Sequence, residues 1–445
     1  MSFINYGRTI CPLLLESSLM SKIAIVGTGY VGLTAGACFA HLGHQVICYD
    51  IDKEKIDKLS NGQIPIVEKD LETLVKEGLE ENKLSFTSIP EEAVSECEVI
   101  FLCVPTPQRS DGTTDISMVD SAVSSIAQIL PENSILVNKS TVPVGSAQKV
   151  IEGLNRPDIE VVSNPEFLRE GTAVDDFLKP ERIIIGSKNP DAAQIVAELY
   201  KKIEAPLLIT DPISAETIKY TANAFLVTKL SFINSIAAVC EGVGADITDV
   251  IKGIGSDSRI GEKYMSPGPG WGGSCFPKDT KSLIHMAGQA GYNFRFLDTA
   301  VAVNEEQFDR VVQKIRTAVG GELEGKIVAV WGLTFKAGTD DLRDSPSLAV
   351  IKRLHEEGAA VTAHDPTVGQ HKEGIPEQVT ISKEPLEACE NANAVVLLTD
   401  WKEYETIGPD DVTDRLADLN LIDTRNVFNP KEWEDKGFTY QGIGR

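Results

Sequence analysis

The feature that most constrains this fold is an alternation of short apolar runs with segments of helical periodicity, which begins at Lys22. Strands that are apolar along their whole length must be buried on both faces, and the helices between them can provide that cover. The pattern therefore predicts an α/β domain with a parallel sheet between two layers of helices. The apolar runs occupy residues 23–26, 46–49, 99–104, 134–137, 159–162 and 183–185.

A second region, which starts at Gly325, repeats the pattern of the first. We therefore predict two Rossmann-like doubly wound domains, at residues 20–210 and 323–445, joined by a central helical domain at 211–322 with one long helix. Generic packing rules for β-α-β units could produce the same similarity by chance. Lys22-Ile23-x-Ile25-Val26-Gly27 is matched by Lys326-Ile327-x-Ala329-Val330-x-Gly332, and Gly43-x-x-Val46-x-x-x-Asp50 by Gly358-x-x-Val361-x-x-x-Asp365.

The long helix is expected at the start of the central domain. Asp211 is a suitable N-cap and Pro212 fits the first turn, whereas glycines at 242 and 244 end a periodic segment that reaches about Cys240. This length is unusual in a globular domain, so we expect the helix to bridge domains or to line a subunit interface. Residues 1–19 do not have the pattern of a signal peptide, and we expect them to form a poorly ordered extension.

The charge balance restricts the partners of the chain. Its 445 residues include 42 Lys and Arg against 66 Asp and Glu, a formal net charge of -24, which argues against nucleic acid and anionic membrane surfaces. No apolar run approaches the roughly 20 residues of a membrane span. The 8 cysteines are scattered without metal-ligand spacing, as expected in a reducing cytoplasm, so we expect no metal site.

The first apolar run leads directly into Gly27-x-Gly29-x-x-Gly32, and a helical segment follows. In a dinucleotide site the first glycine forms a tight turn, the second lets the backbone approach the pyrophosphate, and the third allows close packing of helix on strand. Asp50 ends the next run, where an acid accepts hydrogen bonds from ribose hydroxyls and repels a 2′-phosphate. The motif predicts NAD rather than NADP, with FAD as a minor alternative.

Cys275 has an unusual setting in Gly272-Gly273-Ser274-Cys275-Phe276-Pro277-Lys278-Asp279. The two glycines permit close approach of a ligand, and the proline begins a helical segment over about 278–287. A thiol just before a helix N-terminus is favoured as the thiolate, which is a common way to activate a nucleophilic cysteine. We therefore predict a nucleophile, with a buried structural cysteine as the alternative.

Other polar residues occur where ligands are expected to bind. Lys219 and Asn223 are four positions apart, so they share one face of the long helix, and they need a partner or a ligand unless that face is solvated. Glu166 follows an apolar run and should lie at the carboxyl edge of the first sheet. In the C-terminal domain, the loop 333–346 and Arg425 could bind an anion, although a solvated surface loop is the alternative.

Together these features resemble the UDP-glucose/GDP-mannose dehydrogenase family. The resemblance covers about residues 20–440 and rests on strings that occur in order along the chain. These are Gly27-Thr28-Gly29-Tyr30-Val31-Gly32-Leu33, Val104-Pro105-Thr106-Pro107, Lys139-Ser140-Thr141-Val142-Pro143, Asn164-Pro165-Glu166-Phe167-Leu168-Arg169-Glu170-Gly171, residues 272–279 and Phe335-Lys336.

The resemblance implies an enzyme that uses two molecules of NAD to oxidise C6 of UDP-glucose from an alcohol to a carboxylate, giving UDP-glucuronate. It implies that Cys275 forms a thiohemiacetal and then a thioester with the sugar. It also implies roles for the remaining catalytic residues. Lys219 and Asn223 would stabilise the oxyanion, Asp279 and Glu166 would handle protons and the hydrolytic water, and Thr141 would hold that water.

Two sets of binding residues also follow from the resemblance. The cofactor set is Gly27, Gly29, Tyr30, Val31, Gly32, Asp50, Lys55, Thr106, Thr141, Glu170 and Arg343. The substrate set is Glu166, Phe167, Leu168, Lys219, Asn223, Arg259, Gly272, Lys336 and Arg425. Arg259 is expected to come from a neighbouring subunit, which would make a dimer the smallest complete active unit. The protein is therefore expected to be a homodimer or a larger homo-oligomer.

Three alternatives remain at this point. A sister enzyme would oxidise GDP-mannose or a UDP-N-acetylhexosamine, although in the last group the segment before the nucleophile usually departs from the one found here. A two-electron hydroxyacid dehydrogenase would leave Cys275 and the C-terminal domain unexplained. A non-catalytic NAD-binding protein would be expected to have lost Cys275, Lys219 or Asp279, and all three are present.

Overall fold

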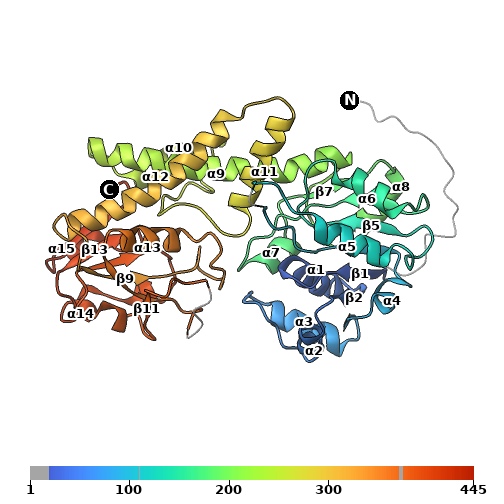
Figure 1. Ribbon diagram of the computed structural model, residues 1–445, viewed down its shortest axis with the longest axis horizontal. Coiled ribbons are helices and arrows are strands. Elements are labelled where there is room, and N and C mark those ends of the chain that lie inside the picture. The colour runs from blue at the N-terminus through green and yellow to red at the C-terminus, as the bar shows by residue number, and fades with distance from the viewer. Residues whose placement is uncertain (1–19, 110, 370–373) are drawn as a thin grey trace.

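The computed structural model describes residues 20–109, 111–369 and 374–445, and the extension expected at 1–19 lies outside these residues. Two sheets lie side by side, and one long helix runs across both of them (Figure 1). The predicted fold class, two Rossmann-like domains joined by a segment with one long helix, is confirmed.

The first sheet has the strand order β3-β2-β1-β4-β5-β6-β7-β8. Its strand pairs are parallel except for β6 and β7, which meet in antiparallel orientation at Ser163 and Gly186, so the expectation of an entirely parallel sheet is wrong at this point. The strands are β1 (Lys22–Val26), β2 (Gln45–Tyr49), β3 (Leu84–Thr87), β4 (Val99–Leu102), β5 (Ile135–Asn138), β6 (Glu160–Ser163), β7 (Ile183–Gly186) and β8 (Leu207–Thr210).

Both faces of this sheet are covered, because successive residues of a strand point to opposite sides. In β1, Ile23 and Ile25 belong to one apolar core, and Ala24 and Val26 belong to a second core on the other face. The helices that supply the cover are α1 (Tyr30–His41), α2 (Lys53–Ser60), α3 (Leu71–Glu80), α4 (Pro90–Val94), α5 (Ser117–Ile126), α6 (Ser146–Leu154), α7 (Ala173–Leu178) and α8 (Pro190–Glu198).

The long helix α9 (Pro212–Val243) begins as predicted, because the Asp211 carboxylate accepts the Ser214 N–H at 2.9 Å. It continues past the predicted end near Cys240 and stops only at Gly244, whose φ of 75° suits glycine. The rest of the central segment is helical as well. It comprises α10 (Ile247–Gly255), α11 (Phe276–Gln289) and α12 (Arg295–Ala318).

By length and composition alone, α9 could cross a membrane, although its apolar residues do not form one uninterrupted run in the sequence. In this fold it packs against α11 and α12, and 44% of its most apolar stretch is buried inside the chain. Several apolar side chains of this helix remain exposed at intervals of seven residues, with Phe225 at 63%, Phe232 at 55% and Val239 at 57%. The single chain therefore leaves an apolar stripe of α9 uncovered in the part that the structure describes.

The second sheet has the order β11-β10-β9-β12-β13-β14, with all its pairs parallel. Trp331 at the end of β9 stacks on Tyr404 in its core. The C-terminus returns to the central helices, where the Ile247 N–H donates to the Gly444 carbonyl at 2.9 Å. The elements are β9 (Ile327–Trp331), α13 (Pro346–Glu356), β10 (Ala360–His364), β11 (Thr380–Ile381), β12 (Ala394–Leu397), α14 (Pro409–Val412), β13 (Asn420–Asp423), α15 (Pro430–Glu434) and β14 (Thr439–Gly442).

Candidate active site

Lys219 and Asn223 lie one turn apart on α9, and both residues are buried. The Lys219 Nζ atom donates to Glu166 Oε1 at 2.8 Å, and the other carboxylate oxygen of Glu166 accepts the Leu168 N–H at 2.6 Å. Burial disfavours both charges, but their mutual attraction outweighs it. The pKa of Lys219 is raised and the pKa of Glu166 is lowered, so both groups are charged.

Cys275 is the N-cap residue of α11, so the predicted position before a helix is confirmed. In the first turn of this helix lies Asp279, which is fully buried. Its Oδ2 atom accepts from Asn223 Nδ2 at 2.6 Å, and its Oδ1 atom accepts from Lys278 Nζ at 2.5 Å. Polar contacts between α9 and α11 therefore hold the nucleophile next to Lys219.

The charge state expected for Cys275 is corrected by the structure. Burial raises the pKa of the thiol, and the carboxylates of Asp279 and Glu166 act in the same direction, although Lys219 opposes them. The sequence argument considered only the helix terminus, which favours the thiolate. The effect of burial is the larger one, so the raised pKa favours the thiol over the thiolate.

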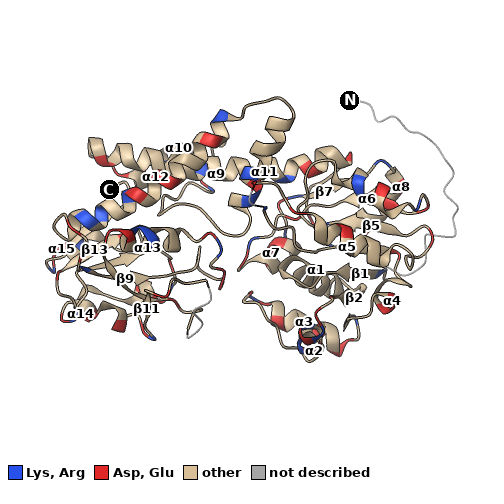
Figure 2. Ribbon diagram, in the orientation of Figure 1, with Lys and Arg blue, Asp and Glu red and all other residues tan. Residues whose placement is uncertain are grey.

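Glu166, Lys219, Asn223 and Cys275 line a cavity of about 780 Å³ between α9, α11 and loops of both Rossmann-like domains. Asp279 is not among its lining residues, and its carboxylate contacts it through Asn223. Acidic and basic segments meet near α11 at this junction (Figure 2). The sequence analysis missed Arg182, whose guanidinium carbon lies 3.7 Å from the centre of the Phe167 ring, because nothing in its local sequence marks it. The predicted residues that the structure brings together in this cavity are Glu166, Phe167, Leu168, Glu170, Lys219, Asn223, Gly272, Cys275 and Lys336.

Thr141 lies beside this cavity rather than in its lining. With Lys219 it lines a much smaller cavity, and its backbone carbonyl accepts the Thr106 hydroxyl at 2.7 Å. This hydrogen bond links the two loops that follow β4 and β5 at the carboxyl edge of the first sheet.

Two predicted substrate residues lie apart from the cavity in the single chain. Arg259 is exposed and pairs with Asp257 two residues before it. Arg425 is mostly buried at the end of β13, where its Nε atom donates to the Leu398 carbonyl at 2.7 Å and its guanidinium lies against Gly268.

The glycine loop between β1 and α1 leaves room for a ligand at one specific position. A Cβ atom on Gly32 would lie 1.9 Å from the Gly27 carbonyl oxygen, and one on Gly27 would lie 2.8 Å from the Cys103 carbonyl oxygen. Gly29, in contrast, has open space around it, and no side chain caps the helix that it begins. The free N–H groups of that first turn therefore face a space that suits a pyrophosphate.

Asp50 lies next to this loop. Its carboxylate accepts the Thr28 N–H at 2.9 Å, the Thr28 hydroxyl at 2.7 Å and the Lys55 ammonium at 2.9 Å. Burial opposes the charge of Asp50, but these hydrogen bonds hold its pKa below the usual range. An ionised carboxylate at this position fits the ribose hydroxyls of NAD.

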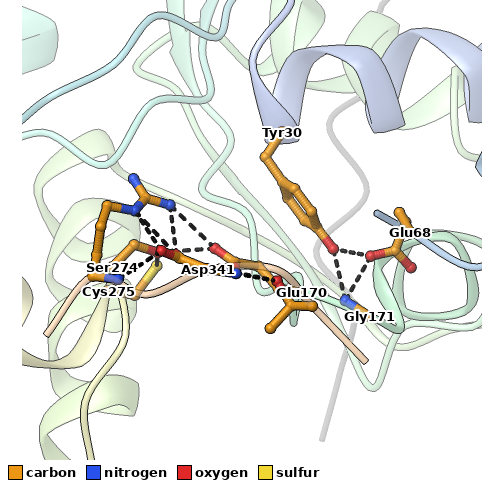
Figure 3. Close-up of polar contacts among 9 residues, drawn as sticks. Tyr30, Glu68, Glu170, Gly171, Ser274, Cys275 and Asp341 are labelled. Carbon is orange, nitrogen blue, oxygen red and sulfur yellow. Dashed lines mark hydrogen bonds and ion pairs between the residues drawn. The ribbon is translucent and has the colours of Figure 1, made fainter. Parts of the chain in front are cut away.

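Glu170 lies where the cavity around Cys275 meets a larger cleft between the two Rossmann-like domains. Its Oε1 atom accepts the Ser274 hydroxyl at 3.0 Å and lies 3.5 Å from the Arg343 guanidinium (Figure 3). Burial and the Asp341 carboxylate raise the pKa of Glu170 to about 7. The sequence analysis missed Ser274, although it directly precedes the nucleophile.

The cleft is about 1120 Å³ in volume, and Gly29, Tyr30, Glu170 and Arg343 are among its lining residues. The glycine loop is also tied to the residue after Glu170. The Gly171 N–H donates to Glu68 at 2.6 Å, and Glu68 accepts the Tyr30 hydroxyl as well (Figure 3). This arrangement fits a dinucleotide. The open space at Gly29 suits the pyrophosphate, the Asp50 carboxylate suits ribose hydroxyls, and the cleft extends from there toward the loop that carries Cys275.

Comparison with known proteins agrees with this geometry. The UDP-glucose/GDP-mannose dehydrogenase family is described by three domain models, and each of them matches this chain. The NAD binding domain matches residues 21–204, the central domain residues 213–306 and the UDP binding domain residues 329–430. The chain belongs to the UDP-glucose/GDP-mannose dehydrogenase family. Its first domain is thus an NAD-binding domain, and the predictions of this family and of NAD as cofactor are confirmed.

Relatives of known name extend over almost the whole chain. A UDP-glucose 6-dehydrogenase of Rhizobium meliloti is 43% identical over 434 residues, which cover 95% of this chain and 99% of the relative. A UDP-glucose 6-dehydrogenase of Bacillus subtilis is also 43% identical, and the match covers 96% of this chain and 94% of that relative. Among solved structures, a UDP-glucose dehydrogenase from Pyrobaculum islandicum has a TM-score of 0.89 at 33% identity, covering 98% of this chain and 100% of that one. This family member is therefore an NAD-dependent nucleotide-sugar dehydrogenase.

Proposed function

We propose that this protein oxidises C6 of UDP-glucose to the carboxylate of UDP-glucuronate, with two molecules of NAD consumed per sugar. The observation that carries the proposal is the position of Cys275. It faces a cavity that the Lys219–Glu166 pair also lines, and this cavity adjoins the cleft that contains the glycine loop. Relatives named for UDP-glucose, at up to 43% identity, support this substrate over GDP-mannose and UDP-N-acetylhexosamines.

A four-electron oxidation explains why a nucleophile is needed, since an aldehyde must form a tetrahedral adduct before it can be oxidised again. Bound NAD accepts two electrons in each of the two oxidations. As the Cys275 sulfur adds to the aldehyde carbon, its thiol proton would pass to a buried carboxylate, Glu166 or Asp279, and the carbonyl oxygen becomes the oxyanion of a thiohemiacetal. Lys219 and Asn223 would stabilise that oxyanion, since each has N–H groups besides the one that it donates to its present partner.

Oxidation of the adduct leaves a thioester on Cys275, which water cleaves to the sugar carboxylate and the free thiol. Glu166 and Asp279 are the buried carboxylates within reach of this chemistry, and they would take up the protons of the alcohol and of the attacking water. Thr141, next to Lys219 in the smaller cavity, would hold the water.

The C-terminal domain would anchor the nucleotide diphosphate. The chain carries a net charge of -24, so a dianionic ligand needs local cations. Lys336 provides one in the cavity, and its pKa is lowered by burial, with Glu170 opposing that effect. Arg425 would reach the ligand from the end of β13, at the carboxyl edge of the second sheet.

We infer that the protein works as a homodimer, or a larger homo-oligomer, in the cytoplasm. The exposed apolar stripe of α9 gives the segment 211–322 a surface for a second copy, and Arg259 would complete the partner's substrate site. The cysteines of the described residues are free thiols, which suits a reducing compartment.

The decisive experiment measures NADH formed per nucleotide sugar consumed. Purified protein is given NAD with UDP-glucose, GDP-mannose or a UDP-N-acetylhexosamine, and two NADH per UDP-glucose are expected. A ratio of one would overturn the thioester mechanism. Faster turnover of another nucleotide sugar would move the assignment to a sister activity.

A further inference from the structure

Lys139 is a buried cation that the proposed mechanism does not use. It follows β5 directly, is 4% exposed, and lines the same cavity as Glu166 and Cys275. Its ammonium donates to Asn164 Oδ1 at 3.1 Å and to the Tyr200 hydroxyl at 3.3 Å. Both acceptors are neutral, and the ion pairs found among the described residues do not include Lys139.

The walls around this ammonium are aromatic. The ring centres of Phe101, Phe177 and Tyr200 lie 6.0, 5.7 and 5.9 Å from the Lys139 Nζ atom. Ring faces attract a cation, but a buried ammonium without a carboxylate partner is still costly for the fold. Such a residue calls for an explanation in terms of what its charge does.

The charged and titratable groups that face Lys139 come from several elements. Burial lowers the pKa of Lys139, and the positive charge of Lys219 on α9 acts in the same direction. Cys103 after β4, Glu166 after β6 and Cys38 on α1 favour the charged form. The two thiols are deeply buried and protonated, because burial raises the pKa of each, so Glu166 is the anion of this group.

Asn164 links Lys139 to Glu166, because it accepts a hydrogen bond from Lys139 and lies two positions before Glu166 in the sequence. Its Oδ1 atom accepts from Lys139 and from the Tyr200 hydroxyl, the latter at 2.6 Å, and its Nδ2 atom donates to the Ile184 carbonyl at 2.8 Å. Only one residue separates Asn164 from Glu166 in the sequence. The cluster around Lys139 therefore fixes the start of the turn that carries the Glu166 carboxylate.

A second cation would help to keep Glu166 ionised during the proposed reaction. Lys219 is its partner at 2.8 Å, and in that reaction the same ammonium would also donate to the oxyanion of the substrate, which would weaken its effect on the Glu166 charge. Burial would then raise the pKa of Glu166 and favour the neutral acid. Besides Lys219, Lys139 is the cation whose charge lowers the pKa of Glu166.

We propose that Lys139 is a positioning residue that holds the Asn164-Pro165-Glu166 turn and keeps Glu166 ionised while Lys219 is engaged with the substrate. The proposal rests on the proposed function for the role of Lys219. It assigns a task to a motif residue that contacts neither the nucleophile nor the glycine loop.

The first test compares Lys139→Met with Tyr200→Phe, which removes a hydrogen bond from the same cluster but keeps the charge. In Lys139→Met the acidic limb of the kcat–pH profile should move to higher pH by about one unit, so kcat at pH values below the parent's limb falls by up to about tenfold more than kcat at pH 9. Tyr200→Phe should leave the limb in place. An equal loss at all pH values in Lys139→Met would overturn the proposal, since that is the result of a structural role.

The second test observes the carboxylate itself and needs neither cofactor nor substrate. Infrared difference spectra of Lys219→Met, with the Glu166 band assigned by Glu166→Gln in the same background, should show an ionised Glu166 at pH 7. Adding Lys139→Met should convert it to the neutral acid. A neutral Glu166 in Lys219→Met alone would overturn the proposal. The two proposals can fail separately. If the spectra are as expected but the enzyme forms only one NADH per UDP-glucose, the proposed function is overturned and the role of Lys139 in keeping Glu166 ionised is not.

Discussion

The Nδ2 atom of Asn223 lies 2.6 Å from the Oδ2 atom of Asp279, and both residues are buried. They belong to different helices and are separated by 56 positions in the sequence. The contact fixes the first turn of α11 on α9, so it sets the place of Cys275 relative to Lys219. The site is thus assembled by polar contacts between helices, which makes its chemistry accessible to single substitutions.

Cys275→Ser is expected to lower kcat by at least about a thousandfold, because a hydroxyl is a far weaker nucleophile than a thiolate. Binding of NAD and of UDP-glucose, measured by titration calorimetry, should change little. Cys97→Ser is the matched control, since that thiol is buried in the first domain away from the cavity. Near-normal turnover in Cys275→Ser would show that this cysteine is structural.

Gly29→Ala and Gly32→Ala should separate cofactor binding from folding. A methyl group at Gly29 meets no other atom of the chain, so the melting temperature should change little while the Kd for NAD rises about tenfold or more. A methyl group at Gly32 would lie 1.9 Å from a backbone oxygen and should destabilise the fold by about 1–3 kcal/mol. Unchanged NAD affinity in Gly29→Ala would contradict the cofactor position.

Gly171→Ala tests the contact between the two Rossmann-like domains. Gly171 has a φ of 81°, and a Cβ atom there would lie 2.7 Å from the Gly338 carbonyl oxygen. Gly145→Ala is the control, because Gly145 has a φ of 91° but nothing near its Cβ position. Both variants should lose about 1 kcal/mol to backbone strain, and only Gly171→Ala should also raise the KM for NAD. If the KM for NAD is the same in Gly171→Ala as in Gly145→Ala, the contact between Gly171 and Gly338 has no role in NAD binding.

Glu170 should make stability depend on pH near neutrality. Its folded pKa of about 7 exceeds the 4.5 of a free glutamate, so its contribution to stability is complete below pH 4.5 and is lost as the pH rises through 7. Glu170→Gln should therefore raise the melting temperature relative to the parent at pH 8, by about 1–2 °C, and not at pH 4.5. Calorimetric scans at both pH values measure this. A variant less stable than the parent at pH 8 would contradict the assignment.

The central strands of the first sheet could be predicted because they are apolar along their whole length, as Ile23 to Val26 show. The edge strands could not. β3 and β8 lie at the two edges of the sheet. β3 alternates apolar and polar residues, and the apolar residues of β8, Leu207 to Ile209, remain 41–47% exposed. The reversal between β6 and β7 was also hidden, since no local signal encodes the direction in which a strand joins a sheet.

The candidate site divides in the same way. The glycine loop, the Asp211 cap and the N-cap position of Cys275 follow from local rules, and the sequence predicted them. The pairing of Lys219 with Glu166 joins residues 53 positions apart, and the burial that raises the pKa of Cys275 depends on the packed domains. Both therefore needed the folded chain.

The setting of Cys275 has a consequence for its reactivity toward oxidants. Peroxides attack thiolates much faster than thiols, and the raised pKa of Cys275 favours the thiol. Oxidation of Cys275 by hydrogen peroxide is therefore expected to be slow at neutral pH and to become faster as the pH rises.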